Sequence, residues 1–540
     1  MKESRILVIA LARVGDLLQS LPAISDLNRL SGGKGVAVVV QKSLTSLVSS
    51  HPAISRVFSF DGDPLLDALK REGWAVAGLD RLQEFHQSLL EYKPDCVVNL
   101  THTPFAGRLA SALDCQNISG GSLDSNRRTV LNGTWTKYFF TLLKTRSSNS
   151  FNLVDVYRGI SAGERGEVEP LRIGESEDRF ARAELARLPK KKRVFLGIGA
   201  HHPLRRWGTE QWIALGRILA RQDDIGMVLV GDQGEVPTAN EIQSAIGADC
   251  LNYCGKTNLM QLAALISHSD LCVGNDSGPL HLAASLGKPC LGIYLAMASP
   301  WETGPYSPGA VSVAPDLSCY PCAENSVCAR PLCQQRISGE SVAEIALNLI
   351  HRNQVPSALS DIVVRESQFD ASGWCLLKGK RTPEDELRLV WREILLVILG
   401  GQTKDQAQVN LTHISSITLE RLHYSIAAVL NQIENVSLGN QSQVTALNLL
   451  PRVPELIFRF PEVGTLLELY RLNRAECLQA IPCHLRCYIS PEELLQDQLQ
   501  LSLRLLEGAL ESEKTSCANS SFAEKKPMQS MADSCYPHCR

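Results

Sequence analysis

The segment from Gly274 to His281 holds the densest group of side chains in the chain that could bind a phosphate group. It reads Gly-Asn-Asp-Ser-Gly-Pro-Leu-His and follows the apolar run 271–273. Small residues at a strand–helix turn let a ligand approach the backbone, and unpaired N–H groups at a helix start suit a diphosphate. The candidate binding residues are Asn275, Asp276, Ser277, Gly278 and His281. The local alternative is a plain helix N-cap formed by Asp276 or Ser277.

A single carboxylate stands just after the first predicted strand. Asp16 follows the continuous apolar run 6–11, which is typical of a strand buried on both faces. The carboxyl ends of strands in an α/β sheet face the ligand crevice, so Asp16 could remove a proton from an attacking hydroxyl group. The alternative is that Asp16 caps the following helix. Gly15 is the one glycine of this loop, where a dinucleotide-binding fingerprint needs three, and this disfavours a dehydrogenase.

Two further loops of the second half of the chain also follow predicted strands. The segment 199–207 carries Arg205 and Arg206, and two arginines suit an anionic ligand. Adjacent histidines usually point apart, so we favour a polar contact between His201 and a diphosphate over a metal site. Glu235 would either accept hydrogen bonds from a sugar or adenosine hydroxyl or favour a helix dipole, and both interpretations stay open.

A cysteine-rich loop follows these segments. Its cysteines are Cys319, Cys322, Cys328 and Cys333. Four cysteines so close together resemble a zinc or cluster site, but their spacing is not that of a standard zinc finger. We therefore favour a loop that closes the domain and keep metal binding as the weaker alternative.

These loops need a framework of strands and helices to bring them together. From residue 5 to about 350, short β-rich runs alternate with helical segments, as in mostly parallel sheets covered by helices. The pattern restarts after the charged interval 174–193, which divides it into two α/β halves. After about residue 350 long helical stretches dominate and strand-like runs are rare. We predict two α/β domains (1–170 and 171–350), a helical domain (351–512) and a disordered tail (513–540).

Composition excludes several classes of protein. Lys and Arg total 54 against 57 Asp and Glu, a net charge of −3, whereas nucleic-acid-binding proteins usually carry a basic excess. No run of about 18 apolar residues predicts a transmembrane helix, so we expect a cytoplasmic protein. In a reducing cytosol most of the 17 cysteines are expected to be buried thiols and not disulfides.

Taken together, residues 5 to about 350 resemble glycosyltransferase family 9, the ADP-heptose:lipopolysaccharide heptosyltransferases and their relatives. The matching segments are ILVIALARVGDLLQSLPAI, GIGAHHPLRRWGTEQW, LVGDQGE, CGKTNLMQLAALISHSDLCVGNDSGPLHLAASLGKP and the cysteine-rich loop. The resemblance implies an α/β fold of GT-B type, with two facing Rossmann-like domains. The first would bind the acceptor and the second the nucleotide-sugar donor. It further implies an inverting transfer that uses no metal and no other cofactor.

The resemblance also implies a role for each candidate residue. Asp16 would be the catalytic base, Arg205 would stabilise the leaving diphosphate, and Arg13 would contact the acceptor. The donor-binding residues would be His201, Arg206, Glu235, Asn275, Asp276, Ser277, Gly278 and His281. Two departures concern the donor. Arg205 stands where the family usually has Lys, and His201 stands where it usually has a small hydroxyl residue.

The expected partners are an ADP-sugar or related donor with a heptose-like sugar, and a lipopolysaccharide-core or other lipid-linked or polysaccharide acceptor. Nucleic acid is not expected. Such an acceptor would bring the protein into peripheral contact with the inner face of the inner membrane. Two alternatives stay open. One is an inactive relative that binds a nucleotide sugar or glycan and acts through the helical domain, and the other is a nucleotide-sugar epimerase, which would convert the donor without an acceptor.

Overall fold

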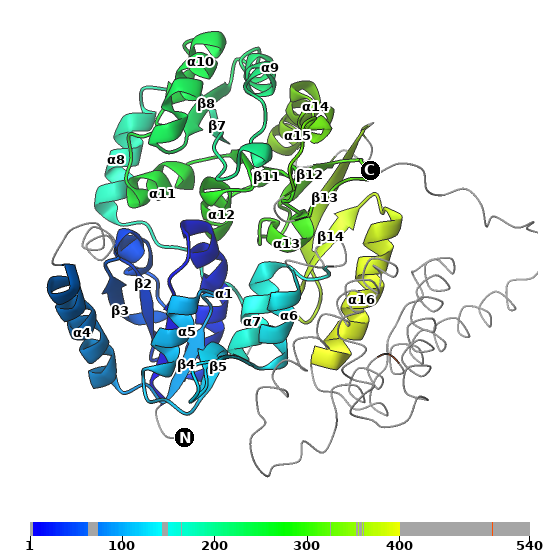
Figure 1. Cartoon of the computed structure of the whole chain (residues 1–540). Helices are drawn as coiled ribbons and strands as arrows, with labels where there is room; N and C mark the ends of the chain where they lie inside the picture. The colour runs from blue at the N-terminus through cyan, green and yellow to red at the C-terminus, as the bar shows by residue number, and fades with distance from the viewer. Residues whose placement is uncertain are drawn as a thin grey trace, which may run out of the picture.

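The computed structural model describes residues 4–62, 74–142, 149–163, 165–323, 326–352, 355, 359, 361–399 and 499. It contains two sheets of mostly parallel strands, each covered by helices, and these form two facing α/β halves (Figure 1). The predicted GT-B type of fold is therefore confirmed.

The first half is built on a six-stranded sheet in the order β3-β2-β1-β4-β5-β6. Its strands are β1 (Ile6–Ala10), β2 (Val36–Gln41), β3 (Ile54–Phe60), β4 (Cys96–Asn99), β5 (Ile118–Leu123) and β6 (Thr129–Asn132). All five residues of β1 are buried, because β1 pairs in parallel with β2 and β4 and is covered on both faces. The antiparallel strand β6 closes one edge of the sheet.

Helices cover both faces of this sheet. They are α1 (Val14–Leu30), the short α2 (Thr45–Val48), α4 (Trp74–Tyr92), α5 (Pro104–Ser111), α6 (Thr134–Leu142) and α7 (Leu153–Ser161). The first of these begins four residues after β1 ends, so Asp16 lies in its first turn, close to the carboxyl end of that strand.

The second half is built on an eight-stranded sheet in the order β14-β13-β12-β11-β10-β7-β8-β9. Its strands are β7 (Lys192–Gly197), β8 (Ile225–Val230), β9 (Cys250–Asn252), β10 (Leu271–Asn275), β11 (Cys290–Ile293), β12 (Val311–Pro315), β13 (Ile362–Phe369) and β14 (Cys375–Gly379). Its helices are α8 (Glu175–Leu185), α9 (Thr209–Leu219), α10 (Val236–Ile246), α11 (Leu259–Ser267), α12 (Gly278–Ser285), α13 (Pro300–Thr303), α14 (Leu332–Arg336) and α15 (Gly339–Arg352). The strands β7, β8, β10 and β11 are parallel, so their carboxyl ends share one edge.

The predicted helical domain begins at residue 351, and this prediction is wrong where the chain forms the strands β13 and β14. They form an antiparallel hairpin that extends the second sheet from β12. The strand β13 was not predicted because a buried strand rarely carries a charge, and Arg365 is buried in it. Its guanidinium donates to the carboxylate of Asp385 at 2.7 Å, so the charge is paired inside the protein.

The helix α16 (Pro383–Leu399) agrees with the helical stretches predicted after about residue 350. The rest of the predicted helical domain, apart from Leu499, and the predicted tail lie outside the described residues. In the described part of the chain, no helix has the length and apolar character needed to cross a membrane.

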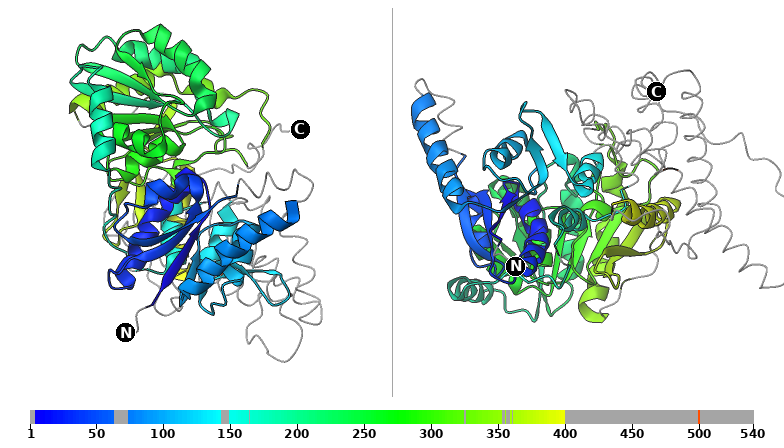
Figure 2. Two further views of the ribbon diagram at one scale, coloured as in Figure 1. Left: turned by 90° about the vertical axis from the view of Figure 1, so that its left-hand side faces the viewer. Right: turned by 90° about the horizontal axis from the view of Figure 1, so that it is seen from below.

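The two halves meet where α1 of the first faces α12 of the second (Figure 1), and a view from the side shows the second half stacked on the first (Figure 2). The hairpin β13–β14 and the helix α16 lie on the side of the second half that adjoins α6 and α7 (Figure 1). One core cluster contains buried residues of both halves, for example Leu17 and Leu18 of α1 together with Leu280 and Leu282 of α12. The ends of β1 and β10 therefore lie on opposite sides of one interface.

Candidate active site

Asp16 faces the second half across this interface. Burial raises the pKa of its carboxyl group, while the charges of His281 and Arg13 act in the opposite direction. The helix beginning at Val14 comes so close to α12 that a Cβ atom on Gly15 would lie 3.2 Å from Cδ2 of His281. Similarly, a Cβ atom on Gly278 would lie 2.9 Å from a methyl group of Val14. The small residues of both turns thus allow the two helix starts to touch.

The turn before α12 leaves its first N–H groups without a side-chain cap. Ser277 occupies the N-cap position, but its hydroxyl group donates to the carbonyl oxygen of Asn275 at 3.2 Å and does not cap the helix. Because Pro279 has no N–H group, the amides of Ser277 and Gly278 are the ones left to meet a ligand at this helix start. The plain N-cap interpretation of Ser277 is therefore not what the structure shows.

Asn275 plays a structural part in this turn. Its side chain is fully buried, and it accepts a hydrogen bond from the backbone N–H of Trp207 at 3.1 Å. Its amide nitrogen donates to the carbonyl oxygen of Ile198 at 2.8 Å. These bonds tie the loop after β7 to the end of β10, so Asn275 positions the backbone and does not offer its amide to a ligand.

Asp276 lies at the centre of a buried polar cluster. Its carboxylate accepts hydrogen bonds from His281 Nε2 at 3.1 Å and from Thr303 Oγ1 at 2.8 Å, and it pairs with Arg205. Burial alone would raise the pKa of Asp276, but the charge of Arg205 and the contacts with His281 and Thr303 hold it below its usual value. Asp276 therefore stays ionised and fixes both the arginine and the histidine beside the turn.

The loop after β7 brings the remaining donor candidates to the same edge. Arg206 donates to the carbonyl oxygen of Ala200 at 2.8 Å and lies 3.8 Å from a carboxylate oxygen of Glu235. Glu235 caps its own short helical turn by accepting from the N–H of Asp232 at 2.7 Å, and burial raises the pKa of its carboxyl group. His201 is exposed on this loop. Arg13 of the first half is exposed as well, next to Asp16.

The structure thus gathers the predicted residues into one region with two sides. Asp16 and Arg13 lie on the side of the first half, and the segments 199–206, 235 and 275–281 lie on the side of the second. Sequence reasoning missed Thr303, which reaches Asp276 from the short helix α13. No motif marks this threonine, because its partner is 27 residues away in the chain.

The cysteine-rich loop packs beside the loop after β7, where Gln334 donates to the carbonyl oxygen of Arg206 at 2.9 Å. Cys333 is buried in α14, whereas Cys319 and Cys328 are exposed. Burial, followed by the neighbouring cysteines, raises the pKa of the Cys322 thiol, so these side chains share one neighbourhood. Within the ranges that the structure describes, no group of three His, Cys, Asp or Glu side chains is placed to hold a metal ion.

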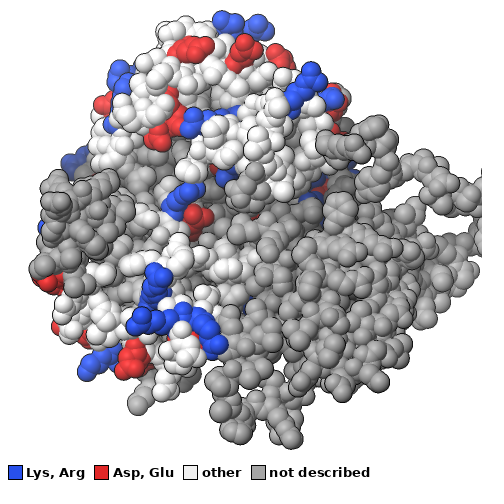
Figure 3. Space-filling model, in the orientation of Figure 1, with Lys and Arg blue, Asp and Glu red and all other residues white. Residues whose placement is uncertain are grey.

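A cavity of about 710 Å³ opens in the first half, at the carboxyl ends of β4 and β5. Its wall includes the side chains of Arg108, Arg127 and His102. Basic side chains gather on this face of the first half, over α5 and β5 (Figure 3). Next to the cavity, Thr101 accepts a hydrogen bond from the N–H of Leu11 at 2.7 Å, which joins its wall to the end of β1.

His102 connects this cavity to the interface between the halves. Its ring stacks on Phe139 with 3.5 Å between ring centroids and lies parallel to Tyr157. Burial lowers the pKa of His102 to about 3, so the ring is neutral. Burial and then the charge of Asp16 raise the pKa of Tyr157, which places Asp16 close to this aromatic group.

The fold and the site define a class of protein. Two facing α/β halves, with a carboxylate on one side and a helix start without a side-chain cap on the other, are arranged as in the GT-B fold. A crystal structure of a family 9 glycosyltransferase from Veillonella parvula shares this fold, with a TM-score of 0.52 and 19% identity over 65% of this chain and 98% of that one.

Comparison with known sequences finds similarity to one family. Residues 163–331 match the model of glycosyltransferase family 9 (heptosyltransferase). Lipooligosaccharide heptosyltransferase 2 of Haemophilus influenzae is 30% identical over 151 residues, which are 27% of this chain and 43% of that protein. Lipopolysaccharide heptosyltransferase 1 of Pseudomonas aeruginosa is 21% identical over 335 residues, which are 62% of this chain and 90% of that protein. The chain is therefore similar to family 9 heptosyltransferases, and the match at 30% identity spans less than half the length of that relative.

Proposed function

We propose that this protein transfers a heptose-like sugar, with inversion, from an ADP-sugar or related nucleotide sugar to a lipopolysaccharide-core or other surface-glycan acceptor. The observation that carries the proposal is the position of Asp16. Its carboxyl group has a raised pKa and lies against His281 and Asp276 of the opposite half. A base on one half and an anion site on the other are what a transfer between two separately bound substrates requires.

The reaction would proceed in one displacement. The acceptor oxygen attacks the anomeric carbon from the face opposite the diphosphate, and Asp16 accepts the proton of that hydroxyl group. The bond between the anomeric carbon and the diphosphate oxygen breaks, and the nucleoside diphosphate leaves with the electron pair. Closure of the halves would exclude water and limit hydrolysis of the donor.

Positive groups on the second half would stabilise the leaving diphosphate. The N–H groups at the start of α12 point their partial charge at this position, and Arg206 and His201 are exposed beside it. Arg205 is already paired with Asp276. Because this pair neutralises part of its positive charge, Arg205 would stabilise the leaving diphosphate less than an unpaired arginine. No step in this mechanism uses a metal ion or another cofactor.

The cavity of the first half is the proposed acceptor site. Its volume of about 710 Å³ is in the range of small-molecule sites, and its wall carries hydroxyl groups and two arginines, which suit an anionic sugar. The charge of Asp124, also in the wall, is committed to Arg128 at 2.8 Å, so it does not neutralise Arg108 or Arg127. The exposed Arg13 would contact the acceptor at the interface. The same basic face would meet a membrane that carries a lipid-linked acceptor.

The test is a transfer assay with purified protein, ADP-heptose and a lipopolysaccharide core that lacks heptose. Mass spectrometry of the acceptor should show the mass of one added heptose, together with release of ADP. ADP release without a modified acceptor would contradict transfer. Conversion of the donor to an isomer without an acceptor would identify an epimerase instead. Donor binding without either reaction would identify an inactive binding protein.

A further inference from the structure

A chain of buried polar groups joins the two halves at α7. Asp155 of this helix is fully buried, and its carboxylate accepts hydrogen bonds from two residues of the second half. These are Tyr306, whose hydroxyl group donates at 2.9 Å, and Cys375, whose backbone N–H donates at 3.0 Å. Arg165, in the connection between the halves, pairs with the same carboxylate at 2.7 Å. One side chain of the first half thus holds two separate segments of the second.

The chain of contacts continues to the helix that carries Asp16. Arg158, one turn after Asp155 in α7, donates from Nη1 to the hydroxyl oxygen of Tyr306 at 3.1 Å. The same guanidinium binds both carboxylate oxygens of Asp26 of α1, at 2.6 Å and 2.9 Å. Arg158 and Asp26 are both almost fully buried. The hydroxyl group of Tyr306 is therefore connected to α1 through a single arginine.

Aromatic packing reinforces this joint on its outer side. Trp374, at the turn between β13 and β14, stacks on Trp135 of α6 with 5.3 Å between ring centroids. The guanidinium of Arg165 lies over the Trp374 ring, 3.4 Å from its centroid. Asn152, the N-cap of α7, donates to the carbonyl oxygen of Gly304 at 2.9 Å. Consequently α7 is bound to the second half at its N-cap, at Asp155 and at Arg158.

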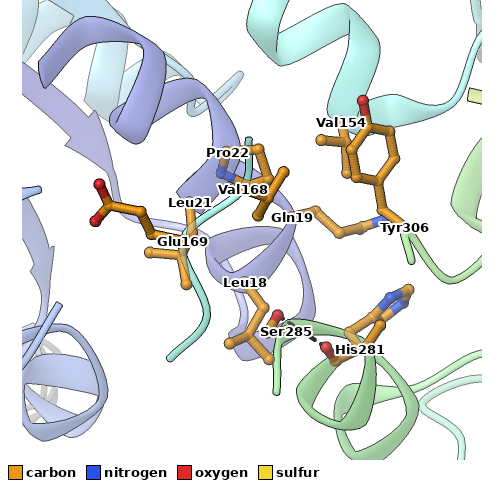
Figure 4. Close-up of a pocket in the computed structure, with 11 residues that line it drawn as sticks. Leu18, Gln19, Leu21, Pro22, Val154, Val168, Glu169, His281, Ser285 and Tyr306 are labelled. Carbon is orange, nitrogen blue, oxygen red and sulfur yellow. Dashed lines mark hydrogen bonds between the residues drawn. The ribbon is translucent and has the colours of Figure 1, made fainter. Parts of the chain in front are cut away.

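Little open space lies beside the joint. A cavity of about 30 Å³ lies between α1, α7 and α12, with Gln19, His281 and Tyr306 in its wall (Figure 4). This is about the volume that one water molecule occupies, so the cavity does not hold a sugar. The cavity wall contains side chains of α1, α7 and α12, so these three helices meet at this point.

We propose that Tyr306 and Asp155 are positioning residues for the transfer reaction. By fixing α7 to the second half they set the place of α1, and with it the distance from Asp16 to the sugar held at the start of α12. This inference rests on the proposed function. The physical reason is that buried charged groups are stable only with their full set of partners, so the joint has one favoured arrangement. A misplacement of about 1 Å between reacting groups can cost about a hundredfold in rate.

The test variant is Tyr306→Phe, which removes the hydroxyl group and keeps the ring that packs on Phe369. Its matched control is Tyr253→Phe. Tyr253 is also buried and donates to a carboxylate, that of Glu184 at 2.6 Å, but away from the joint. We expect kcat to fall about ten- to a hundredfold in Tyr306→Phe. Donor affinity without acceptor should stay within about twofold, because the proposed donor contacts lie in the second half alone.

Two results would overturn the proposal. One is a kcat of Tyr306→Phe equal to that of Tyr253→Phe. The other is a loss of donor affinity as large as the loss of kcat, which would indicate general damage to the second half. Asp155→Asn, which disturbs the same joint from the other side, should show the same split between kcat and donor affinity.

Hydrogen–deuterium exchange separates failure of this inference from failure of the proposed function, because it needs no activity. In Tyr306→Phe the peptides covering residues 12–20 and 153–161 should exchange faster than in the wild type, and in Tyr253→Phe they should not. Unchanged exchange in both peptides would refute the joint even if the wild type proves to be an active transferase. Faster exchange in Tyr306→Phe, together with a wild-type protein that shows no transfer activity, would support the joint and refute the proposed function.

Discussion

The two aspartates that follow central strands, Asp16 after β1 and Asp276 after β10, have opposite environments. Asp276 is buried among Arg205, His281 and Thr303, and its pKa is lowered. Asp16 is partly buried without a comparable set of partners, and burial raises the pKa of its carboxyl group. The same residue type at the same kind of position is therefore an anchor in one half and an available proton acceptor in the other.

The comparison shows that a position at the end of a strand does not by itself decide the role of a carboxylate. An ionised carboxylate that holds an arginine and a histidine has used its hydrogen-bonding capacity, so it is a poor base. A carboxylate with a raised pKa and without such a set of partners can accept a proton. Changing each aspartate in turn tests whether Asp16 is the base and Asp276 the anchor.

The largest effect is expected from Asp16→Asn in the transfer assay. Asparagine keeps the shape but cannot accept the proton, so the rate should fall about 10²- to 10⁴-fold, while donor affinity measured by calorimetry stays nearly unchanged. Glu210→Gln is a matched control, because Glu210 is an exposed acidic residue in the first turn of α9. Turnover of Asp16→Asn near the wild-type rate would remove Asp16 from the role of base.

The second effect concerns the stability of Asp276→Asn. Removing this charge leaves Arg205 without its buried partner, so the free energy of unfolding should drop by about 3–5 kcal/mol, and donor affinity should fall with it. Asp270→Asn is the control, since Asp270 pairs with Lys192 at 3.1 Å nearer the surface, where such pairs contribute about 1 kcal/mol or less. Equal losses in urea denaturation of the two variants would contradict the anchor role.

The third effect is on pH dependence, because the pKa values of the two aspartates are shifted in opposite directions. Because the pKa of Asp16 is raised, the acid limb of kcat/KM should lie at a higher pH than an ordinary aspartate gives, about 3.9. Because the pKa of Asp276 is lowered in the folded state, its stabilisation is present above the unfolded value and is lost as pH falls through the folded value. The stability difference between wild type and Asp276→Asn should therefore shrink only below about pH 4. An acid limb of kcat/KM at or below the ordinary aspartate value would count against Asp16.

The smallest effect is a gain in stability in Asp16→Asn. The raised pKa means that the fold disfavours the charged form, so the ionised carboxylate lowers stability at neutral pH. Replacing it with a neutral side chain should raise the melting temperature slightly, whereas Asp276→Asn should lower it. A melting temperature that falls in both variants would remove the contrast between the two sites.

Much of the fold follows from local patterns. The parallel strands β1 and β8 are continuous apolar runs, and β7 and β10 each contain a shorter one, because their buried parts are covered on both faces by helices. The loops after these strands stood out for the same reason, since their glycines and polar residues interrupt the runs. The hairpin β13–β14 was missed because Arg365 breaks its apolar run and is compensated by Asp385, 20 residues later.

The sequence by itself determined the two α/β halves, the turns that carry Asp16 and the segment 274–281, and the resemblance to family 9. These features depend on residues close together in the chain, where hydrophobic periodicity and turn residues act directly. The tertiary structure alone decided that Asp276 is an anchor, that Thr303 supports it, and that Tyr306 reaches Asp155 across the interface. The physical reason is that a pKa and a buried hydrogen bond depend on groups brought together by folding from distant parts of the chain, and no local pattern records them.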